Sequence, residues 1–589
     1  MKRTGDRHWQ LVLLVALIVS ASQITPSAFA KTYYVDCDSS QAASDGSLAA
    51  PLRALDRVNT LKLRGDDQVL FKRGSVCSGS LRMEGSGSDG HPIIVSAYGS
   101  GPLPRIEAKN QSESSFRLFN QACWEVSSLD LQGGTEYGVF IGGDAGSLHH
   151  FHLRDLRVHD VRGKLKRKES GLVVIRSDGA AVTFDDIELD GILASNTTQW
   201  AGIFVSGSRE KPATHVRIQN SMVHDVQGDG IVMFNTKDGR IARSAAWHTG
   251  MEHAESIGTP NAIWTWQCAD CMVEQNEAFL TDSPGVDGGA FDIDYGNSRN
   301  TVRNNFAHDT QGYCVSIFGA HSVTAASVVE GNLCLNNGMS PRLAQRQGAI
   351  LIMTWENGSV DGLDIRDNRI DWQPGGDTAA IQTGDKLDAR NVFLANNEII
   401  SNGTTFVNPL LTYRGEKNRY LFVDGDTEGA NAIAEHRFAL LPETHSSVGL
   451  ASPRKEDEAH RARGWQLIAS FPKSMLQSGG DPVLRGMLVN LKSAALQFGQ
   501  MGLRTTIRSD ADMTELSSDW LGGEVGMEFV HVPPLTDTDF SLKIISPLGQ
   551  IVQEWKGYIG PATLGGALRS ACGKPSYGRL TFEAVPATD

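Results

Sequence analysis

A repeat of about thirty residues is the feature of this sequence that most restricts its fold. Each copy has a small residue followed by an alternating apolar run, and successive copies begin 24 to 35 residues apart. One such unit is too short to bury its own apolar face, so stacked units are expected to share one continuous core. The copies begin at Gly138, Gly171, Gly202, Gly230, Ala262, Ala290, Cys314, Ala349 and Ala380.

A column of polar residues recurs with the same period. Asn and Asp tolerate left-handed backbone and bond to neighbouring backbone groups, so a stacked turn favours them. Each unit also contains two or three short β-rich segments and no convincing helix, which predicts a parallel β-solenoid. The column comprises Asp155, Asp186, Asn220, Asn276, Asn305, Asn332, Asn368 and Asn397.

The segments Thr32–Asp36, Gly65–Gly74 and Pro92–Gly99 resemble the entry coils of known solenoids. Together with the repeat, they make residues 32–425 similar to the right-handed parallel β-helix proteins of the pectate-lyase-like superfamily. The resemblance implies a mainly β fold class, with a right-handed parallel β-helix over residues 31–425. Because this superfamily includes lyases, hydrolases, epimerases, adhesins and phage fibres, function has to be inferred from a site.

The N-terminal segment 1–30 has the order of a secretory signal peptide, which predicts a secreted or periplasmic protein. Three basic residues precede the apolar run Leu11–Val19, and Ala28-Phe29-Ala30 forms the cleavage site. Removal of the segment changes the net charge from −14 to −16, because it takes away three bases and one acid. Such a charge argues against nucleic acid as a partner. No second long apolar run is present, so no membrane span is expected.

Export makes disulfides possible, and Cys37 and Cys77 flank the first folded segment where they could staple it. Cys268 and Cys271 form a CxxC motif, but no second CxxC and no paired histidines complete a zinc site. We interpret this motif as local packing or a disulfide.

The repeat stops near residue 425. We expect a linker over 426–464 and an α/β domain over 465–589, with helices at 482–498 and 561–571. The order resembles a thioredoxin-like domain, but the loop Pro472–Gly479 contains no cysteine, so we expect packing against the solenoid or protein interaction in place of redox chemistry. The expected strands are Trp465–Phe471, Leu503–Ile507, Met527–Val532, Phe540–Ile545 and Ile551–Trp555.

Side chains alternate across a strand, so the residue after each apolar core residue should point outward. Most of these outward residues are apolar or aromatic, which indicates that something covers or binds this face. The first outward column reads Phe140, Val173, Phe204, Val232, Trp264, Asp292, Ser316, Leu351 and Gln382. The second reads Gly142, Ile175, Ser206, Phe234, Trp266, Asp294, Phe318, Met353 and Gly384.

Two adjacent coils predict an active site, because stacking places Trp264 beside Asp292 and Trp266 beside Asp294. Two outward carboxylates at this spacing suit the acid/base pair of a glycoside hydrolase, and their repulsion should raise one pKa. The indoles would hold sugar rings. This hypothesis describes an enzyme that cleaves a polysaccharide without a required cofactor.

Neighbouring residues extend this site. Asp287 and His308 are the supporting catalytic candidates, and Glu356 is an alternative acid. The segment Asp287–Tyr295 resembles an Asp-rich segment of secreted β-helix proteins that act on polysaccharides. The loop Trp247–Pro260 could close over the site. Further aromatic residues that we expect to contact substrate are Phe318, Tyr295 and Trp355.

Two other functions remain open. A calcium-assisted polysaccharide lyase would use Tyr295, His308 or Arg346 as the base. In that case Ca²⁺ would be bound by Asp287, Asp292 and Asp294, since calcium prefers oxygen ligands. A non-catalytic glycan-binding or structural protein would use the aromatic columns alone. The basic run Arg162–Lys168 is expected in a solvated loop, or it holds the far end of an anionic chain.

Overall fold

The computed structural model describes residues 30–422 except 110–111, 251–256, 339, 373–377 and 402–404, together with the backbone of six strands between 466 and 583. Several predictions concern residues outside these ranges. They are the signal peptide, the linker 426–464, the helices at 482–498 and 561–571, the strand Met527–Val532, and residues 251–256 of the loop Trp247–Pro260 that was expected to close over the site.

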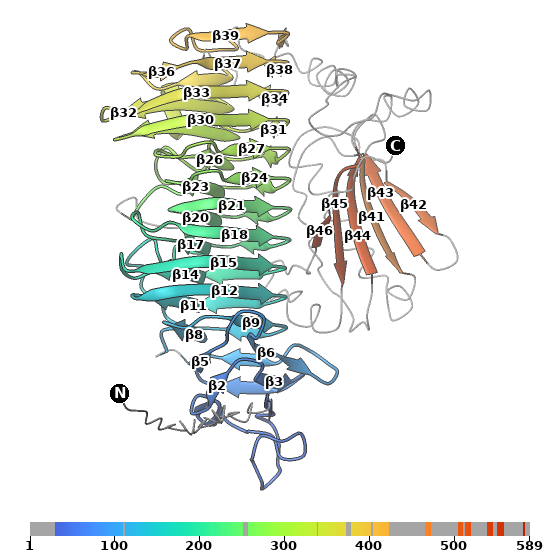
Figure 1. Ribbon diagram of the computed structural model, residues 1–589. Coiled ribbons are helices and arrows are strands. Elements are labelled where there is room, and N and C mark those ends of the chain that lie inside the picture. The colour runs from blue at the N-terminus through green and yellow to red at the C-terminus, as the bar shows by residue number, and fades with distance from the viewer. Residues whose placement is uncertain are drawn as a thin grey trace, which may run out of the picture.

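Three long parallel sheets run through residues 30–422 and stack coil upon coil from the N-terminal end (Figure 1). The chain visits the first, second and third sheet in turn and then returns to the first one coil higher. Each strand therefore pairs with the strand one coil away, as β23, β26 and β29 do. This is the predicted parallel β-helix.

The first sheet has 15 strands, all paired in parallel along one wall of the helix. Its strands are β1 (Thr32–Val35), β3 (Gln68–Lys72), β6 (Ile93–Tyr98), β9 (Trp124–Ser127), β12 (Gly146–Arg154), β15 (Val182–Asp190), β18 (Ala213–Gln219), β21 (Thr236–Ala242), β24 (Met272–Glu274), β27 (Thr301–Arg303), β30 (Val323–Glu330), β33 (Ser359–Arg366), β36 (Ala389–Arg390), β37 (Val392–Ala395) and β39 (Tyr413–Glu416).

The second sheet has 13 strands and follows the first along each coil. Its strands are β4 (Val76–Ser78), β7 (Arg105–Glu107), β10 (Asp130–Gln132), β13 (Arg157–Val161), β16 (Leu193–Thr197), β19 (Met222–His224), β22 (Ala245–Trp247), β25 (Glu277–Phe279), β28 (Phe306–His308), β31 (Leu333–Leu335), β34 (Arg369–Trp372), β38 (Glu398–Ser401) and β40 (Arg419–Phe422).

The third sheet has 10 strands and carries the predicted outward columns. Two short helices, α1 (Leu55–Val58) and η1 (Pro341–Arg346), and a small sheet of β2 (Lys62–Arg64) and β5 (Glu84–Ser86) complete this part of the chain. Neither helix approaches the length and apolarity of a membrane crossing within the described ranges. The third sheet contains β8 (Phe116–Phe119), β11 (Tyr137–Gly143), β14 (Gly171–Ser177), β17 (Ala201–Ser206), β20 (Ile231–Phe234), β23 (Ile263–Trp266), β26 (Phe291–Ile293), β29 (Val315–Ala320), β32 (Ile350–Trp355) and β35 (Ile381–Thr383).

One continuous apolar core fills the inside of the solenoid, and all three sheets contribute to it from the coil of β8 to that of β35. The predicted disulfide Cys37–Cys77 is present, and Cys314–Cys334 forms a second one. Cys268 and Cys271 are free, buried thiols of the core, which is the packing alternative of the CxxC prediction.

The register of β14 differs from the predicted one. Gly171 pairs with Tyr137 and Ala201, so the small residue that marks the other coils is shifted by one position here. As a result Val173 and Ile175, which were expected to point outward, belong to the inner core. A criterion based on small residues fails at this coil because glycine occurs one position early.

Buried asparagines form a ladder at the turn between the first and second sheets. The Asn332 side-chain oxygen accepts from the backbone and side-chain N–H groups of Asn305, both at 3.0 Å. The Asn332 amide donates to Val302 O and to Asn368 Oδ1, again at 3.0 Å. Each buried backbone group of the turn thereby finds a partner in the next coil. The ladder contains Asn276, Asn305, Asn332, Asn368, Asn397 and Asn418.

The ladder confirms the five asparagines predicted from Asn276 onward and corrects the reason for them. The left-handed residue is the one before each ladder asparagine, such as Asn304 with a φ of 52°. Asp155 and Asn220 are themselves left-handed, with φ of 56° and 51°. Asp186 was placed in this column wrongly, because it lies inside β15.

The described C-terminal strands form a separate antiparallel sheet in the order β42-β43-β41-β44-β45-β46. Four of them overlap predicted strands, whereas β43 and β46 were not expected. The thioredoxin-like assignment stays a prediction, since its helices fall outside the described residues. The strands are β41 (Gln466–Pro472), β42 (Thr505–Ser509), β43 (Met513–Asp519), β44 (Asp539–Ile545), β45 (Ile551–Tyr558) and β46 (Thr581–Glu583).

We expect Asn332→Ala to lower the free energy of unfolding by about 3 kcal/mol or more, because a buried donor or acceptor left without a partner costs about 1–3 kcal/mol. The change removes partners from Asn305, Val302 and Asn368 at once. The measurement is the urea unfolding midpoint. Thr301→Ala, at a half-exposed position of the preceding coil, is the control and should shift the midpoint little. Equal shifts in the two variants would contradict a structural role for the ladder.

Candidate active site

The predicted alternation of inward and outward side chains along β23 and β26 is correct. Strands β23 and β26 lie next to each other (Figure 1), and Trp264 pairs with Asp292 in the parallel register. The flanking Ile263, Phe291 and Ile293 belong to the inner core. Trp264 instead belongs to a cluster of outward side chains on the third sheet. The four predicted residues of these two coils therefore face the same outer surface.

Protein atoms cover one half of this surface and leave the other half accessible. Asp292 is 2 % exposed and Trp264 is 4 % exposed. Trp266 and Asp294, one step along each strand, are half-buried. Asp294 is thus the residue of the predicted pair that keeps part of its surface exposed.

Asp229, in the turn before β20, holds the indoles in place. It accepts from Trp264 Nε1 at 2.9 Å, from the indole N–H of Trp200 and from the backbone N–H of Asn261 at 3.1 Å. Its burial raises its pKa despite these donors. Sequence reasoning missed Asp229, although its setting between Gly228 and Gly230 was a signal that a turn with a functional side chain occurs there.

Asn261 connects the turns to the buried carboxyl group of Asp292. Its amide donates to Asp292 Oδ2 at 3.2 Å, while its own oxygen accepts from Gly289 N at 2.8 Å. The other oxygen, Asp292 Oδ1, is buried and has no hydrogen-bond partner among the described residues. A buried acceptor without a partner is costly and is found more often at functional sites than elsewhere.

Asp287 and Tyr313 lie in two further turns and act electrostatically with the carboxyl group of Asp292. Asp287 is half-buried and accepts a hydrogen bond from the hydroxyl of Thr259. The hydroxyl of Tyr313 is fully buried and lacks a hydrogen-bond partner among the described residues. Arg346, at the end of η1, acts electrostatically on both groups.

The carboxyl groups differ in pKa because burial and mutual repulsion act on them unequally. Burial raises the pKa of Asp287 to about 6. Neighbouring atoms also crowd the carboxyl group of Asp294 although part of the residue is accessible, and this loss of hydration raises its pKa to about 8. Asp292 is raised well above its ordinary pKa, first by burial and then by the charges of Asp294 and Asp287.

Lys168 lies over the indoles and opposes these shifts. Its ammonium group is 5.3 Å from the ring centre of Trp200 and 5.9 Å from that of Trp264. Its positive charge lowers the pKa values of Asp229, Asp287 and Asp294. We expected this basic run in a solvated loop or far from the aspartates, and that expectation is wrong for Lys168, because the loop folds back over the third sheet.

The predicted aromatic residues form a chain of edge-to-face contacts beside Asp294. The ring centres of Trp266 and Tyr295 are 5.7 Å apart, and those of Tyr295 and Trp355 are 6.0 Å apart. Phe318 packs against Trp355 at 5.6 Å but is buried. Trp266, Tyr295 and Trp355 are half-buried and therefore present part of their surface to a ligand.

His308 does not belong to this site. It lies in β28 of the second sheet, fully buried between the rings of Phe279 and Phe306. Its nitrogens face Glu277 and Asp309, and these carboxylates raise its pKa to about 9. The sequence placed it near the aspartates only because it follows them closely along the chain.

The predicted calcium ligands are not gathered as a metal cluster. Among the described residues, two groups of His, Cys, Asp or Glu bring three ligand atoms within 4.8 Å of one another, and neither contains Asp287, Asp292 or Asp294. The alternative acid Glu356 is exposed and pairs with His321. In the loop Trp247–Pro260, His248 pairs with Asp225.

A family model described as right handed beta helix region matches residues 170–370, about a third of the chain. Together with the parallel sheets, this match supports a right-handed parallel β-helix, as predicted. No curated protein sequence matches the chain.

Solved structures with similar coordinates are distant in sequence. A GH136 lacto-N-biosidase from Eubacterium ramulus is 18 % identical, over 67 % of this chain and 68 % of that one, with a TM-score of 0.48. An alginate lyase from a Paenibacillus species is 13 % identical, over 66 % of this chain and 99 % of that one, with a TM-score of 0.30. A mannuronan C-5 epimerase A-module from Azotobacter vinelandii is 12 % identical, over 60 % and 90 %, with a TM-score of 0.33.

The raised pKa of Asp294 has a consequence for stability. Its folded-state value of about 8 lies above its ordinary 3.8, so the folded protein keeps a proton that the unfolded chain releases between these pH values. This contribution to stability is complete at the acid end of the window and is lost as the pH rises toward 8. We therefore expect wild type to lose more stability between pH 5 and pH 8 than Asp294→Asn does.

Urea midpoints at the two pH values measure this difference. Asp385→Asn, which changes an exposed aspartate, is the matched control and should behave as wild type. Parallel pH dependences of wild type and Asp294→Asn would mean that Asp294 is ionised in the folded protein at neutral pH.

Proposed function

We propose that the protein is an exported carbohydrate-active enzyme that hydrolyses glycosidic bonds of a polysaccharide at the outer face of β23, β26 and β29. The observation that carries the proposal is the presence of two half-buried aspartates with pKa values of about 6 and about 8 beside half-buried aromatic rings. One acid and one base near neutral pH are what glycoside hydrolysis requires.

The roles follow from the protonation states. Asp294 keeps its proton at neutral pH and would give it to the oxygen of the leaving sugar. Asp287 is ionised above about pH 6 and would act on the opposite side, as the base for water or as the nucleophile. Asp292 lies behind them, and its own pKa is raised well above the ordinary value by burial and by the charges of Asp294 and Asp287.

Binding would depend on the rings and on fixed dipoles. Trp266, Tyr295 and Trp355 offer faces and edges to the apolar side of sugar rings. Asp229 fixes the indole of Trp264, which belongs to the same packed aromatic cluster as Trp266.

A neutral glycan fits the site better than a polyuronate does. At neutral pH Asp287 is ionised, whereas the raised pKa values of Asp292 and Asp294 keep these two groups protonated. An ionised uronate would meet the Asp287 carboxylate and the negative net charge of the chain, which Lys168 and Arg346 offset only in part. This argument favours hydrolysis over the calcium-assisted lyase reaction, which would instead release products with unsaturated uronate absorbance.

Export and the role of the C-terminal region are part of the same proposal. Residues 1–30 would be removed as a signal peptide, which places the enzyme where polysaccharides occur. Residues 465–589 would form a thioredoxin-like domain without redox cysteines that packs against the solenoid.

We expect Asp294→Asn and Asp287→Asn each to lower kcat by about 10²–10⁴-fold, because that is the usual contribution of a general acid or base. Glycan retention should stay within a few-fold of wild type. The measurement is turnover on a panel of polysaccharides with product masses, and Asp385→Asn is the control. Wild-type turnover in either variant would exclude the assigned role, and glycan binding without turnover in wild type would leave the non-catalytic binding function.

The pH profile of the active substrate gives an independent check. The rate should rise as Asp287 ionises near pH 6 and fall as Asp294 loses its proton near pH 8. The upper limb should disappear in the residual activity of Asp294→Asn. A flat profile from pH 5 to pH 9 would contradict an acid/base pair made of these two groups.

A further inference from the structure

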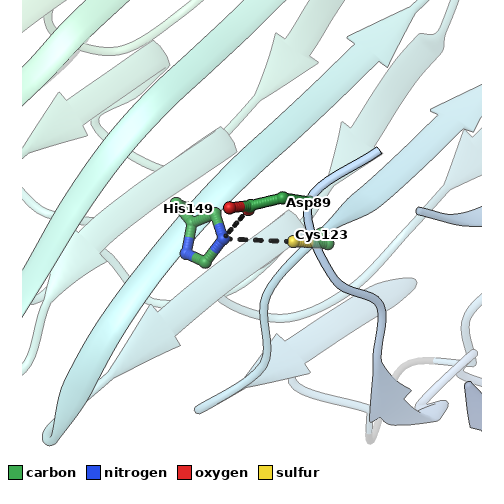
Figure 2. Close-up of side chains that lie close together, drawn as sticks. All are labelled: Asp89, Cys123 and His149. Atoms are coloured by element: carbon green, nitrogen blue, oxygen red, sulfur yellow. Dashed lines mark hydrogen bonds and ion pairs between the residues drawn. The ribbon is translucent and has the colours of Figure 1, made fainter. Parts of the chain in front are cut away.

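A second cluster of chemically reactive side chains lies on the first sheet, near the N-terminal end of the solenoid. Asp89 comes from the loop between β5 and β6, Cys123 precedes β9, and His149 lies in β12. Figure 2 shows the three side chains pointing toward one another. His149 Nε2 is 3.3 Å from Cys123 Sγ and 2.9 Å from Asp89 Oδ1, and the three atoms lie within 4.8 Å of one another.

Hydrogen bonding alone leaves a conflict at this centre. A neutral imidazole nitrogen either carries one proton or accepts one, so it cannot do both. If Nε2 donates to Asp89, it cannot accept the Cys123 thiol proton. If it accepts that proton, its lone pair faces the Asp89 carboxylate. Three electron-pair donors that converge on one point are instead the arrangement that a bound cation satisfies.

The backbone holds the three residues in this arrangement. Cys123 N donates to His149 O at 2.8 Å, and Ala122 N donates to the Ser86 hydroxyl at 3.1 Å. Gly87 allows the loop to approach, because a Cβ there would lie 2.9 Å from Cys123 Cβ and 2.8 Å from its carbonyl oxygen. Cys123 has a φ of 59°, a strained conformation that is common at functional sites.

We propose that Asp89, Cys123 and His149 bind a divalent transition-metal ion of the zinc class. Tetrahedral zinc with one sulfur, one nitrogen and one oxygen ligand separates its ligand atoms by about 3.5 Å, given bond lengths of about 2.0–2.3 Å. The separations of His149 Nε2 from Cys123 Sγ and from Asp89 Oδ1 are a few tenths of an ångström shorter, and the exposed Asp89 side chain can adjust. Thiolate and imidazole favour zinc over calcium or magnesium.

Solvent reaches this site from one side. The Asp89 side chain is 92 % exposed and that of His149 is 35 % exposed, while Cys123 is 1 % exposed. Three protein ligands with an open side leave a fourth position for water. Because the ligands come from three successive levels of the solenoid, the ion would connect its N-terminal coils.

A neighbouring group, Glu125, His150 and His152, also brings ligand atoms together but has other partners. His150 Nδ1 pairs with Asp186 at 2.8 Å, and His152 Nε2 pairs with the same carboxylate at 3.1 Å. Asp186 lies outside that group and occupies its ring nitrogens, whereas the partners of His149 Nε2, Cys123 and Asp89, both belong to the proposed site, so the Cys123 centre is the stronger candidate.

The test uses the full chain, stripped with a chelator and then loaded with Zn²⁺ or Co²⁺. After gel filtration, wild type should retain about one more equivalent of zinc than Cys123→Ser or His149→Ala. The cobalt form should show a thiolate-to-metal charge-transfer band that Cys123→Ser lacks. His215→Ala is the control, because His215 pairs with Asp185 on the same sheet and lies outside the cluster.

Thermal unfolding provides a second readout, since a ligand that binds only the folded state raises Tm. Zinc should raise the Tm of wild type and His215→Ala, and should not change that of Cys123→Ser or His149→Ala. Equal zinc retention in all four proteins would overturn the proposal. Retention that is lost in His150→Ala but kept in Cys123→Ser would also overturn it, because the ion would then belong to the neighbouring group.

Discussion

The structure depends on hydrogen bonds that pass from one coil to the next through buried asparagine side chains. In a parallel stack each turn has backbone groups that face the next coil and no water to satisfy them. The asparagine at this turn supplies both a donor and an acceptor, and so sets the register between neighbouring coils. Because that register decides which side chains face each other on the third sheet, the position of Trp264 beside Asp292 follows from it.

Burial is the main electrostatic influence on the aspartates. Four carboxyl groups share one surface, and the few donors around them do not compensate for the lost hydration. Burial is the largest cause of the raised pKa in all four, with Asp229 and Asp292 buried and Asp287 and Asp294 half-buried. Lys168 limits this effect without cancelling it, since its ammonium group lies over indole rings and forms no direct ion pair with Asp287.

The fold and half of the site could be predicted because both depend on short-range periodicity. Strand alternation and the repeat length were enough to place Trp264, Trp266, Asp292 and Asp294 on one surface. The rest depends on how turns fold over that surface, and no periodicity reports this. Lys168 and Asp229 come from such turns, and His308 was misplaced because nearness along the chain does not tell which of three sheets a residue joins.

The disulfide Cys314–Cys334 has a consequence for how the protein is made. Cys314 follows Tyr313 directly and begins the coil that carries Ser316, opposite Asp292. The covalent link therefore ties one wall of the aspartate surface to the coil above it. Cytosolic thiols are kept reduced, whereas disulfides persist outside the cell and in the periplasm. Protein produced in a reducing host would lack this disulfide. The oxidation state of each preparation should therefore be established before the activities of two preparations are compared.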